Sequence, residues 1–542
     1  MEAQQALVDK ETIPVEAGEP PVESASSSTL PKRKGIRKVE PAVSVDAAGN
    51  PKLKPVNRNR SITVDLESLL APDHPARAIL GLMNNMDFDR FLGAIRTQQG
   101  EKGRPSNDPR ILASVWLYAY SQGIGSAREV ERQMGYEPGL RWLCGDDPVN
   151  HHTLSDFRVD HKTALDGLFQ DFLVVLDKQE WIDLSQVMHD GTKVRANAGV
   201  DTFRREKTVQ ERLAQAKQVL EQMGDPREDN QRARTRKQVA QERAAREHAE
   251  KMTAALEDLE QIREGKTAEK AEQARVSVVE PEARMMKHGD NAMLPSYNVQ
   301  ISTESSNKII VGVHLSQSSS DFESLVPAMD RVKENTGEFP DQAVADGGFT
   351  SKDNIIKVEE RKIDLIGSLA DIDKKRAASA VAAGIDPAFG VQHFKILEET
   401  NTLLCPAGKA MKYKSQSKKR GNKYHVYRAQ GSDCQSCGFQ KKCCPKNPEQ
   451  GRGVSILIQE DPIVANFRKK MASEQAQKIY KKRGPVAEFP NAWIKDKIKL
   501  RKFRLRGLIK AGIETMWACL AYNVKRWIFL SRTKPQVPAC AA

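Results

Sequence analysis

Two short apolar runs in this sequence each lead into an aspartate followed by glycine. They are Val187–Gly191, which reads VMHDG, and Val344–Gly347, which reads VADG. Each run predicts a strand that ends at its aspartate, and open α/β sheets gather their sites at the carboxyl ends of strands. On neighbouring strands, Asp190 and Asp346 would repel each other unless a cation lay between them, and hard oxygen ligands suit Mg²⁺. Taken singly, each Asp-Gly is also an ordinary turn signal.

A third carboxylate is available in a strongly basic segment near the end of the chain. Between Lys478 and Lys510 there are twelve cations and only two acids, Glu488 and Asp496. A carboxylate surrounded by so many positive charges stays ionised, so Glu488 could complete a metal site with the two aspartates. It could equally be a salt-bridge partner, and Asp496 and Glu474 are competing carboxylates.

The ordered set of motifs resembles the DDE transposases of bacterial insertion sequences. Asp190 opens Asp-Gly-Thr-x-x-x-Ala-Asn, Asp346 opens Asp-x-Gly-aromatic, and Tyr-x-x-Arg precedes Glu488 and a lysine. Phe349 stands where this family usually has tyrosine, and four residues separate Arg483 from Glu488 where one common form of the motif has three. The resemblance covers roughly residues 65–530 and includes the segments 280–286, 297–300 and 505–527.

The resemblance implies a core similar to ribonuclease H and phosphoryl transfer on DNA. Asp190, Asp346 and Glu488 would bind two Mg²⁺ ions, or Mn²⁺, one to activate water or a DNA 3′-hydroxyl and one to stabilise the leaving oxygen. Element ends would be cut from flanking DNA and joined to a target strand without a covalent protein–DNA intermediate. Double-stranded DNA is then the partner, and pairing of two element ends favours a homodimer or a higher assembly on DNA.

Basic and polar residues around the three carboxylates are expected to contact DNA. By the resemblance, Arg483 and Lys495 hold phosphates and Tyr480 positions a strand. Residues 497–506 predict a track along the DNA backbone, and binding to it should weaken steeply with salt. The other residues expected to contact DNA are Lys193, Arg195, Asn197, Arg501, Lys502 and Arg504.

Composition and charge narrow the class of protein. The chain has 542 residues, a formal net charge of +13 and 29% charged residues, and this surplus favours a polyanionic partner. No apolar run approaches the ~18 residues of a membrane span, and the N-terminus carries no signal peptide. We therefore expect a cytoplasmic protein with no membrane partner, and the resemblance implies that it is bacterial and nucleoid-associated.

Five of the eight cysteines lie within one short segment of the chain. Their density favours metal binding in a reducing compartment over a disulfide framework. Cys434-x-x-Cys437 has the spacing of a zinc knuckle, and Cys405 with Cys443 would complete a structural zinc site. Cys444 could replace Cys443, and unbound thiols or an iron–sulfur cluster are the alternatives.

The pattern of elements predicts an α/β protein with a sheet covered by helices and an all-α domain before it, and the resemblance implies that this mixed sheet is ribonuclease-H-like. Strands are expected at 297–303, 308–316, 341–349 and 362–369, and a helix at 321–332. The chain is expected to begin with a disordered tail with a basic arm at 1–60 and a helical N-terminal transposase domain at 61–180. The catalytic core is expected at 181–202, 276–395 and 459–532. It is interrupted by a helical hairpin insert at 203–275 and a Cys-rich zinc module at 396–458, and a tail follows at 533–542.

Local signals indicate where individual helices begin. One helix should follow Asp108, and Ser126 with Glu129 three residues later predicts a capping box at the start of the next. The two helices are either a helix-turn-helix that reads DNA or ordinary packing. In the hairpin insert, apolar residues spaced 4, 3, 4, 3 predict a seam between two antiparallel helices that turn near 224–230, and these residues are Val209, Leu213, Ala216, Leu220 and Met223.

We therefore expect a DNA transposase that cleaves and transfers strands with the help of metal ions. One alternative is a non-catalytic DNA-binding protein derived from such a transposase. A second is a metal-dependent nuclease that cuts without joining. A coiled-coil scaffold is a more distant alternative, because the seam covers only about 60 residues.

Overall fold

The computed structural model of the chain describes residues 65–93, 105–222, 236–264, 266–368, 378–397, 400–419 and 422–533, together with Thr63 and Ile95. The expected tail at 1–60, the hairpin turn near 224–230 and all but Thr533 of the expected tail at 533–542 lie outside the described residues. Among the helices that were described, none combines the length and the apolar character needed to cross a membrane.

The predicted helical region before the sheet is present. Its helices are α1 (Pro75–Asn84), α2 (Asp89–Leu92), α3 (Pro109–Ser121), α4 (Ala127–Met134), α5 (Pro138–Leu143), α6 (His151–Asp160) and α7 (Lys162–Lys178). Asp108 caps α3 as expected, since its side chain accepts from the backbone N–H of Arg110. The predicted capping box of α4 is wrong: Ser126 makes no side-chain cap bond, because Glu129 instead accepts from Arg132 and Gln133.

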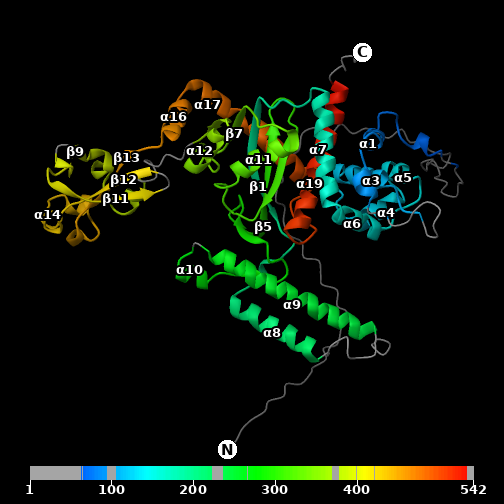
Figure 1. The fold of residues 1–542 in the computed structure, drawn as a ribbon, viewed down its shortest axis with the longest axis horizontal. Coiled ribbons are helices and arrows are strands. Elements are labelled where there is room, and N and C mark those ends of the chain that lie inside the picture. The colour runs from blue at the N-terminus through cyan, green and yellow to red at the C-terminus, as the bar shows by residue number, and fades with distance from the viewer. Residues whose placement is uncertain are drawn as a thin grey trace, which may run out of the picture. The chain divides into compact units, whose positions relative to one another are not determined.

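A mixed sheet forms the centre of the molecule, so the α/β class is confirmed (Figure 1). Its strands are β1 (Gln186–Arg195), β4 (Arg284–Lys287), β5 (Met293–Glu304), β6 (Ile310–Ser316), β7 (Gln342–Ala345) and β8 (Asp364–Gly367). The order is β4-β5-β1-β7-β8, and β6 also pairs with β5. β1, β5 and β6 are antiparallel neighbours, whereas β7 runs parallel to β1 and β8 parallel to β7. The parallel pairs bring the carboxyl ends of β7 and β8 to one edge of the sheet.

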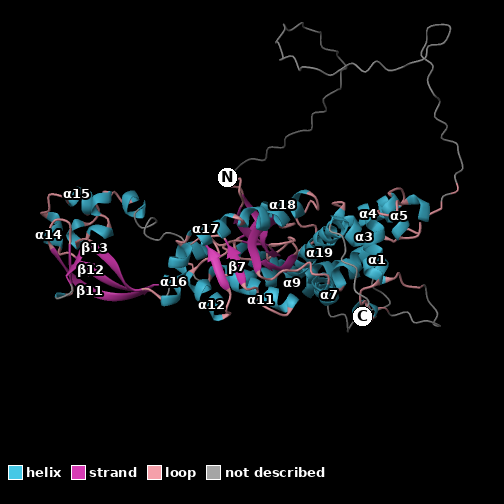
Figure 2. Ribbon diagram, turned by 90° about the horizontal axis from the view of Figure 1, so that it is seen from above, coloured by secondary structure: helices cyan, strands magenta, loops and turns pink. Residues whose placement is uncertain are grey.

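Helices lie on both sides of this sheet (Figure 2). They are α11 (Leu325–Thr336), α12 (Lys352–Glu360), α16 (Pro462–Met471), α17 (Glu474–Lys481), the π-helix η7 (Gly484–Glu488), α18 (Phe489–Asp496) and α19 (Leu508–Thr533). The helix expected from Asp321 starts four residues later, because the Asp321 side chain accepts hydrogen bonds from β5. α19 packs against β6 as well as α3 and α7, so the N-terminal helices and the sheet share one hydrophobic core.

Two long helices lie between β2 (Phe203–Arg204) and β3 (Val276–Ser277). They are α8 (Glu206–Gln222) and α9 (Arg236–Arg263), and the short α10 (Ala268–Glu272) follows them. An ion pair of 2.7 Å joins Glu206 at the start of α8 to Arg263 at the end of α9, so the two helices are antiparallel. Apolar residues of the predicted seam on α8 meet apolar residues of α9, including Val209, Met252 and Leu259.

The Cys-rich segment has a sheet and a small core of its own. Five antiparallel strands are ordered β13-β12-β11-β10-β9, with bounds β9 (Lys395–Leu397), β10 (Thr402–Leu404), β11 (Ala410–Lys419), β12 (Asn422–Arg428) and β13 (Gly453–Gln459). The short helices α14 (Gly431–Gln435) and α15 (Gln440–Cys443) lie between β12 and β13. The buried residues of this core are Phe394, Leu403, Met411, Tyr427, Ala429 and Val454. The remaining described short helices are η1 (Glu67–Leu69), η2 (Val200–Thr202), η3 (Pro387–Phe389), η4 (Val391–His393) and η6 (Pro448–Gln450).

Asn523 of α19 fastens the sheet to this helix and supports a first prediction. Its buried amide accepts from the backbone N–H of Ile310 at 2.9 Å and donates to the carbonyl of the same residue at 2.8 Å. Asn523→Ala should lower the free energy of unfolding by about 2–4 kcal/mol, because it leaves two buried backbone groups without partners. Urea unfolding followed by circular dichroism measures the change.

The matched control is Asn85→Ala, which removes a solvent-exposed amide bonded to the carbonyl of Gly81. This change should cost less than about 1 kcal/mol. Equal losses in the two variants would contradict the role given to Asn523.

Candidate active site

The register of the sheet brings Asp190 and Asp346 together. β7 ends at Ala345, whose pairing partner on β1 is His189, so the next residues on the two strands are the two aspartates. The prediction that a strand ends at the aspartate is correct for Asp346 and wrong for Asp190. β1 continues to Arg195 because β5 still pairs with it on its other side. Asp190 therefore lies where β1 extends beyond the end of β7.

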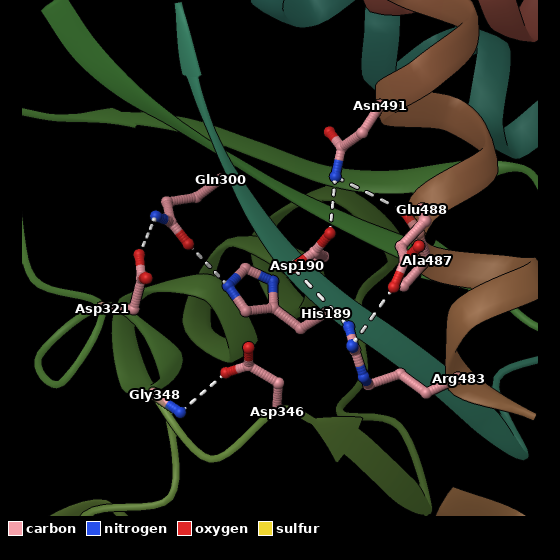
Figure 3. A network of polar contacts seen from close by, with 10 residues as sticks. All are labelled: His189, Asp190, Gln300, Asp321, Asp346, Gly348, Arg483, Ala487, Glu488 and Asn491. Carbon is pink, nitrogen blue, oxygen red and sulfur yellow. Dashed lines mark hydrogen bonds and ion pairs between the residues drawn. The ribbon is translucent and has the colours of Figure 1, made fainter. Parts of the chain in front are cut away.

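Burial and its neighbours set the charge state of Asp190. Its side chain is 18% exposed, and burial raises the pKa of its carboxyl to about 6. The nearby cation of Arg483 and a hydrogen bond from Asn491 oppose this rise in pKa, while the charge of Asp346 adds to it. Arg483 Nη1 lies 3.6 Å from Asp190 Oδ1, and Asn491 Nδ2 donates to Asp190 Oδ2 at 3.0 Å (Figure 3). Two like charges in a partly buried place favour a bound cation.

Glu488 reaches this site through a π-helical turn. Its Oε1 accepts from Nη2 of Arg483 at 3.4 Å, although the carboxylate remains 63% exposed. The extra residue between Arg483 and Glu488 is accommodated by the π-helix Gly484–Glu488, because π-turns repeat at i to i+5. The competing acids lie elsewhere: Asp496 pairs with Arg501, and Glu474 pairs with Lys478.

Sequence reasoning missed Asn491, which is buried in the site. Its Nδ2 donates both to Asp190 and to the carbonyl of Ala487, at 3.0 and 3.4 Å. Its Oδ1 is buried and has no hydrogen-bond partner among the described residues. Asn491 follows Glu488 by three residues, one turn along a helix, and this spacing is the signal that could have identified it.

A second group of polar residues, which sequence reasoning also missed, lies next to Gly191 and Gly348, beside the two aspartates. Asp321 Oδ1 accepts from Gln300 Nε2 at 3.1 Å, and Gln300 Oε1 contacts His189 Nε2 at 2.9 Å. Burial lowers the pKa of His189 to about 3, so its ring stays neutral. A Cβ atom at Gly191 would meet Gln300 Nε2 at 2.7 Å and Asp321 Oδ1 at 2.9 Å. Gly191 therefore makes room for these side chains.

Several of the predicted DNA-binding cations gather near the carboxylates. Burial lowers the pKa of His288, and the positive charges of Lys495, Lys193 and Arg195 lower it further. Burial and the charge of Arg501 lower the pKa of Lys495, whereas Asp190 acts in the opposite direction. Lys193, Arg195 and Lys495 are therefore near enough to act on His288, and Lys495 is near enough to interact with Asp190.

The basic segment 497–506 is held in place by buried acids. Glu514 of α19 accepts from the backbone N–H groups of Arg504 and Leu505 at 3.0 and 3.2 Å. Glu280 accepts from the N–H of Gly507 at 3.1 Å, although it was expected only as part of a family motif. The segment is therefore a fixed surface.

Some of the remaining predicted DNA-binding residues use their polar groups in contacts within the protein, whereas others are exposed to solvent. Arg504 forms an ion pair of 3.6 Å with Glu514, and the amide of Asn197 donates to the carbonyl of Arg504 at 2.7 Å. Both residues therefore have structural roles. Tyr480 packs partly against the main core, and the side chain of Lys502 is exposed.

Two comparisons identify the class of protein. Residues 64–160 match the family model described as Transposase domain (DUF772), and residues 404–528 match the model described as Transposase DDE domain. The second match contains Glu488, Arg483 and Lys495, whereas Asp190 and Asp346 precede it. No curated protein and no solved structure matches the chain. The two matches indicate an insertion-sequence DDE transposase, a class of proteins that act on DNA.

The described part of the chain holds no group of three or more His, Cys, Asp or Glu side chains arranged to bind a metal ion. At the candidate site, Asp190 and Asp346 are neighbours, and Glu488 is turned to Arg483. The donors that are present, carboxylates with the free oxygen of Asn491 beside them, are the hard oxygens that suit Mg²⁺ or Mn²⁺.

The raised pKa of Asp190 gives a prediction for stability. A carboxyl whose pKa rises from 3.8 to about 6 on folding stabilises the protein fully below pH 3.8, and this contribution is lost as the pH rises through 6. Asparagine has no such charge. With metal removed by EDTA, the free energy of unfolding of Asp190→Asn should therefore be about 1–3 kcal/mol higher than that of wild type at pH 8. The difference should shrink toward pH 4.

Urea unfolding at several pH values measures this difference. Glu474→Gln is the control, because Glu474 is exposed and contacts only Lys478. A difference between Asp190→Asn and wild type that does not change with pH would contradict the buried, charge-crowded environment assigned to Asp190.

Proposed function

We propose that this transposase cleaves DNA strands at element ends and transfers them to target DNA, using Asp190, Asp346 and Glu488 with divalent metal ions. The observation that carries the proposal is the position of Asp190 and Asp346 directly after the paired residues His189 and Ala345. The link from Arg483 to both Asp190 and Glu488 supports the assignment of the third acid.

The strand order supports a ribonuclease-H-like core for the catalytic domain. Three antiparallel strands, β6, β5 and β1, are followed by two parallel ones, β7 and β8, with helices on both sides. In this interpretation the α8–α9 hairpin and the Cys-rich sheet are inserts in the core, as expected at 203–275 and 396–458.

Asp190, Asp346 and Glu488 would hold Mg²⁺ or Mn²⁺, which when bound supplies an activated nucleophile and charge stabilisation at phosphorus. The chain's own residues prepare the site. Asn491 orients the Asp190 carboxylate through its N–H, and the π-turn presents Glu488 to solvent, where DNA arrives. Burial of Asp190 strengthens its attraction for a cation.

The fixed basic segment supports a path for the DNA backbone. Arg501, Lys502 and Arg195 are exposed and lie on neighbouring chain segments, since the backbone N–H of Arg195 donates to the carbonyl of Arg501. With Lys193 and Lys495 they would contact phosphates without reading sequence. The two DNA ends that a transposase must join favour a homodimer or a higher assembly on DNA.

The catalytic proposal predicts metal-dependent nicking at one position of a duplex that carries the element end. Asp190→Ala, Asp346→Ala and Glu488→Gln should each lower the nicking rate by roughly 10³-fold or more, because the three acids act as one unit. Gel analysis of end-labelled duplex with Mg²⁺ or EDTA measures the rate, and Glu474→Gln is the matched acidic control.

The same assay separates the alternatives. A labelled target duplex should yield a joined product, and nicks without joining would indicate a nuclease. A wild-type protein that binds the duplex but never nicks it would indicate a non-catalytic DNA-binding protein. Equal nicking by wild type and Asp190→Ala would remove Asp190 from the site.

We further propose that the Cys-rich module binds structural zinc. Its five thiols, those of Cys405, Cys434, Cys437, Cys443 and Cys444, line one pocket. Backbone N–H groups point at two of these sulfurs, from Lys409 to Cys405 at 3.3 Å and from Arg452 to Cys434 at 3.4 Å. A module with so small a buried core needs a further cross-link, and zinc binding would draw the thiols inward.

The zinc proposal predicts about one zinc per chain after purification, measured by mass spectrometry of the metal. Cys434→Ser and Cys443→Ser should lose the zinc and lower the melting temperature, whereas Cys444→Ser should retain it. Cys144→Ser, outside the module, is the control. Absence of zinc from the freshly purified wild type would contradict the proposal.

A further inference from the structure

Arg483 occupies a place in the candidate site that calls for explanation. Its guanidinium lies between Asp190 and Glu488, at 3.6 Å from the first carboxylate and 3.4 Å from the second, with the side chain only 15% exposed (Figure 3). The residue was expected to hold a DNA phosphate. In the structure it neutralises the same acids that are proposed to hold metal.

The contacts that hold Arg483 are loose for an arginine. Its Nη1 is buried without a hydrogen-bond partner in the described part of the chain, and 3.6 Å is too long for a hydrogen bond. Arginine binds carboxylate or phosphate best through two parallel N–H···O bonds, which neither acid receives here. Attraction between charges, rather than a fitted geometry, therefore keeps Arg483 at the site.

Asn491 contacts Asp190 in a different way. It is uncharged, it donates to Oδ2 at 3.0 Å, and its Nδ2 is also fixed by the carbonyl of Ala487. Asn491 therefore fixes the position of Asp190 Oδ2, whereas the positive charge of Arg483 lies near Asp190 Oδ1. The two residues provide a matched pair for separating orientation from charge.

We propose that Arg483 is a positioning residue with two alternative partners: it neutralises Asp190 and Glu488 in the free protein and moves to a DNA phosphate in the complex. The inference rests on the proposed metal site at these acids. While Arg483 faces the acids, a divalent cation must compete with it for the same negative charge. When a phosphate binds the guanidinium in fork geometry, the acids are left to the metal.

This exchange makes metal and DNA binding cooperative. DNA should tighten metal binding, and by thermodynamic linkage metal should tighten DNA binding by the same factor. A coupling of this kind is typically about 5- to 150-fold. Because of this competition, the protein without DNA would bind little metal. Cleavage of DNA at positions other than a bound element end would then be limited.

The experiment measures Mn²⁺ binding to the full chain by electron paramagnetic resonance of the free ion. Each variant is titrated alone and with saturating duplex, and the Mn²⁺ bound to Asp190→Asn with the same duplex is subtracted as background. Wild type should bind at least about 5-fold more tightly with DNA. Arg483→Gln should bind tightly already without DNA, and duplex should change its affinity by less than about 2-fold.

Three further variants act as controls for this experiment. Arg483→Lys keeps the charge and should keep much of the DNA effect. Asn491→Ala removes an uncharged contact to Asp190 and should retain the DNA effect, with weaker binding overall. Arg361→Gln removes an arginine between α12 and β8 that pairs with Asp330 of α11, and this variant should behave as wild type.

The outcomes are distinguishable. If Arg483→Gln equals wild type with and without DNA, while Asp190→Asn abolishes binding, the inference is wrong and the metal site stands. If Arg483→Gln binds more weakly than wild type without DNA, the competition is likewise excluded. If no variant binds more Mn²⁺ than Asp190→Asn, the metal site itself, and with it the proposed function, fails.

Discussion

The structure depends on holding two like charges side by side in a partly buried place. β1 and β7 are paired in parallel up to His189 and Ala345, so the register leaves Asp190 and Asp346 adjacent. Burial raises the pKa of Asp190 to about 6, even though Arg483 and Asn491 act to lower it. Burying like charges side by side is costly even with Arg483 nearby, so stability alone does not explain this arrangement. The crowding is explained if a cation belongs there.

The surrounding elements hold this charge in position from several directions. The π-turn before α18 aligns Arg483 and Glu488 despite the extra residue between them, and α18 carries Asn491 to the same carboxylate. Asp321 and the neutral His189 form hydrogen bonds with polar side chains of β5. The long helix α19 packs against both the sheet and the N-terminal helices, so these parts share one hydrophobic core.

The sequence predicted the parts of this site that depend on local patterns. Short apolar runs before Asp190 and Asp346, the helix caps and the alternating strands follow rules that act over a few residues. It did not predict that β1 continues past Asp190, because that depends on pairing with β5, about a hundred residues away.

Long-range contacts explain the other differences as well. Asn491, Asp321 and the structural roles of Asn197 and Arg504 arise from contacts between distant segments. The capping box predicted for α4 is absent, and Glu129 instead accepts from Arg132 and Gln133.

The most direct test of the account is the position of a metal ion in a crystal of the protein with Mn²⁺ and an element-end duplex. Anomalous scattering at the manganese edge locates the ion without assumptions about the protein. The account predicts an anomalous peak between the carboxylates of Asp190 and Asp346, within about 2.0–2.3 Å of an oxygen of each. A peak elsewhere, or carboxylates that face each other with no ion between them, would contradict it.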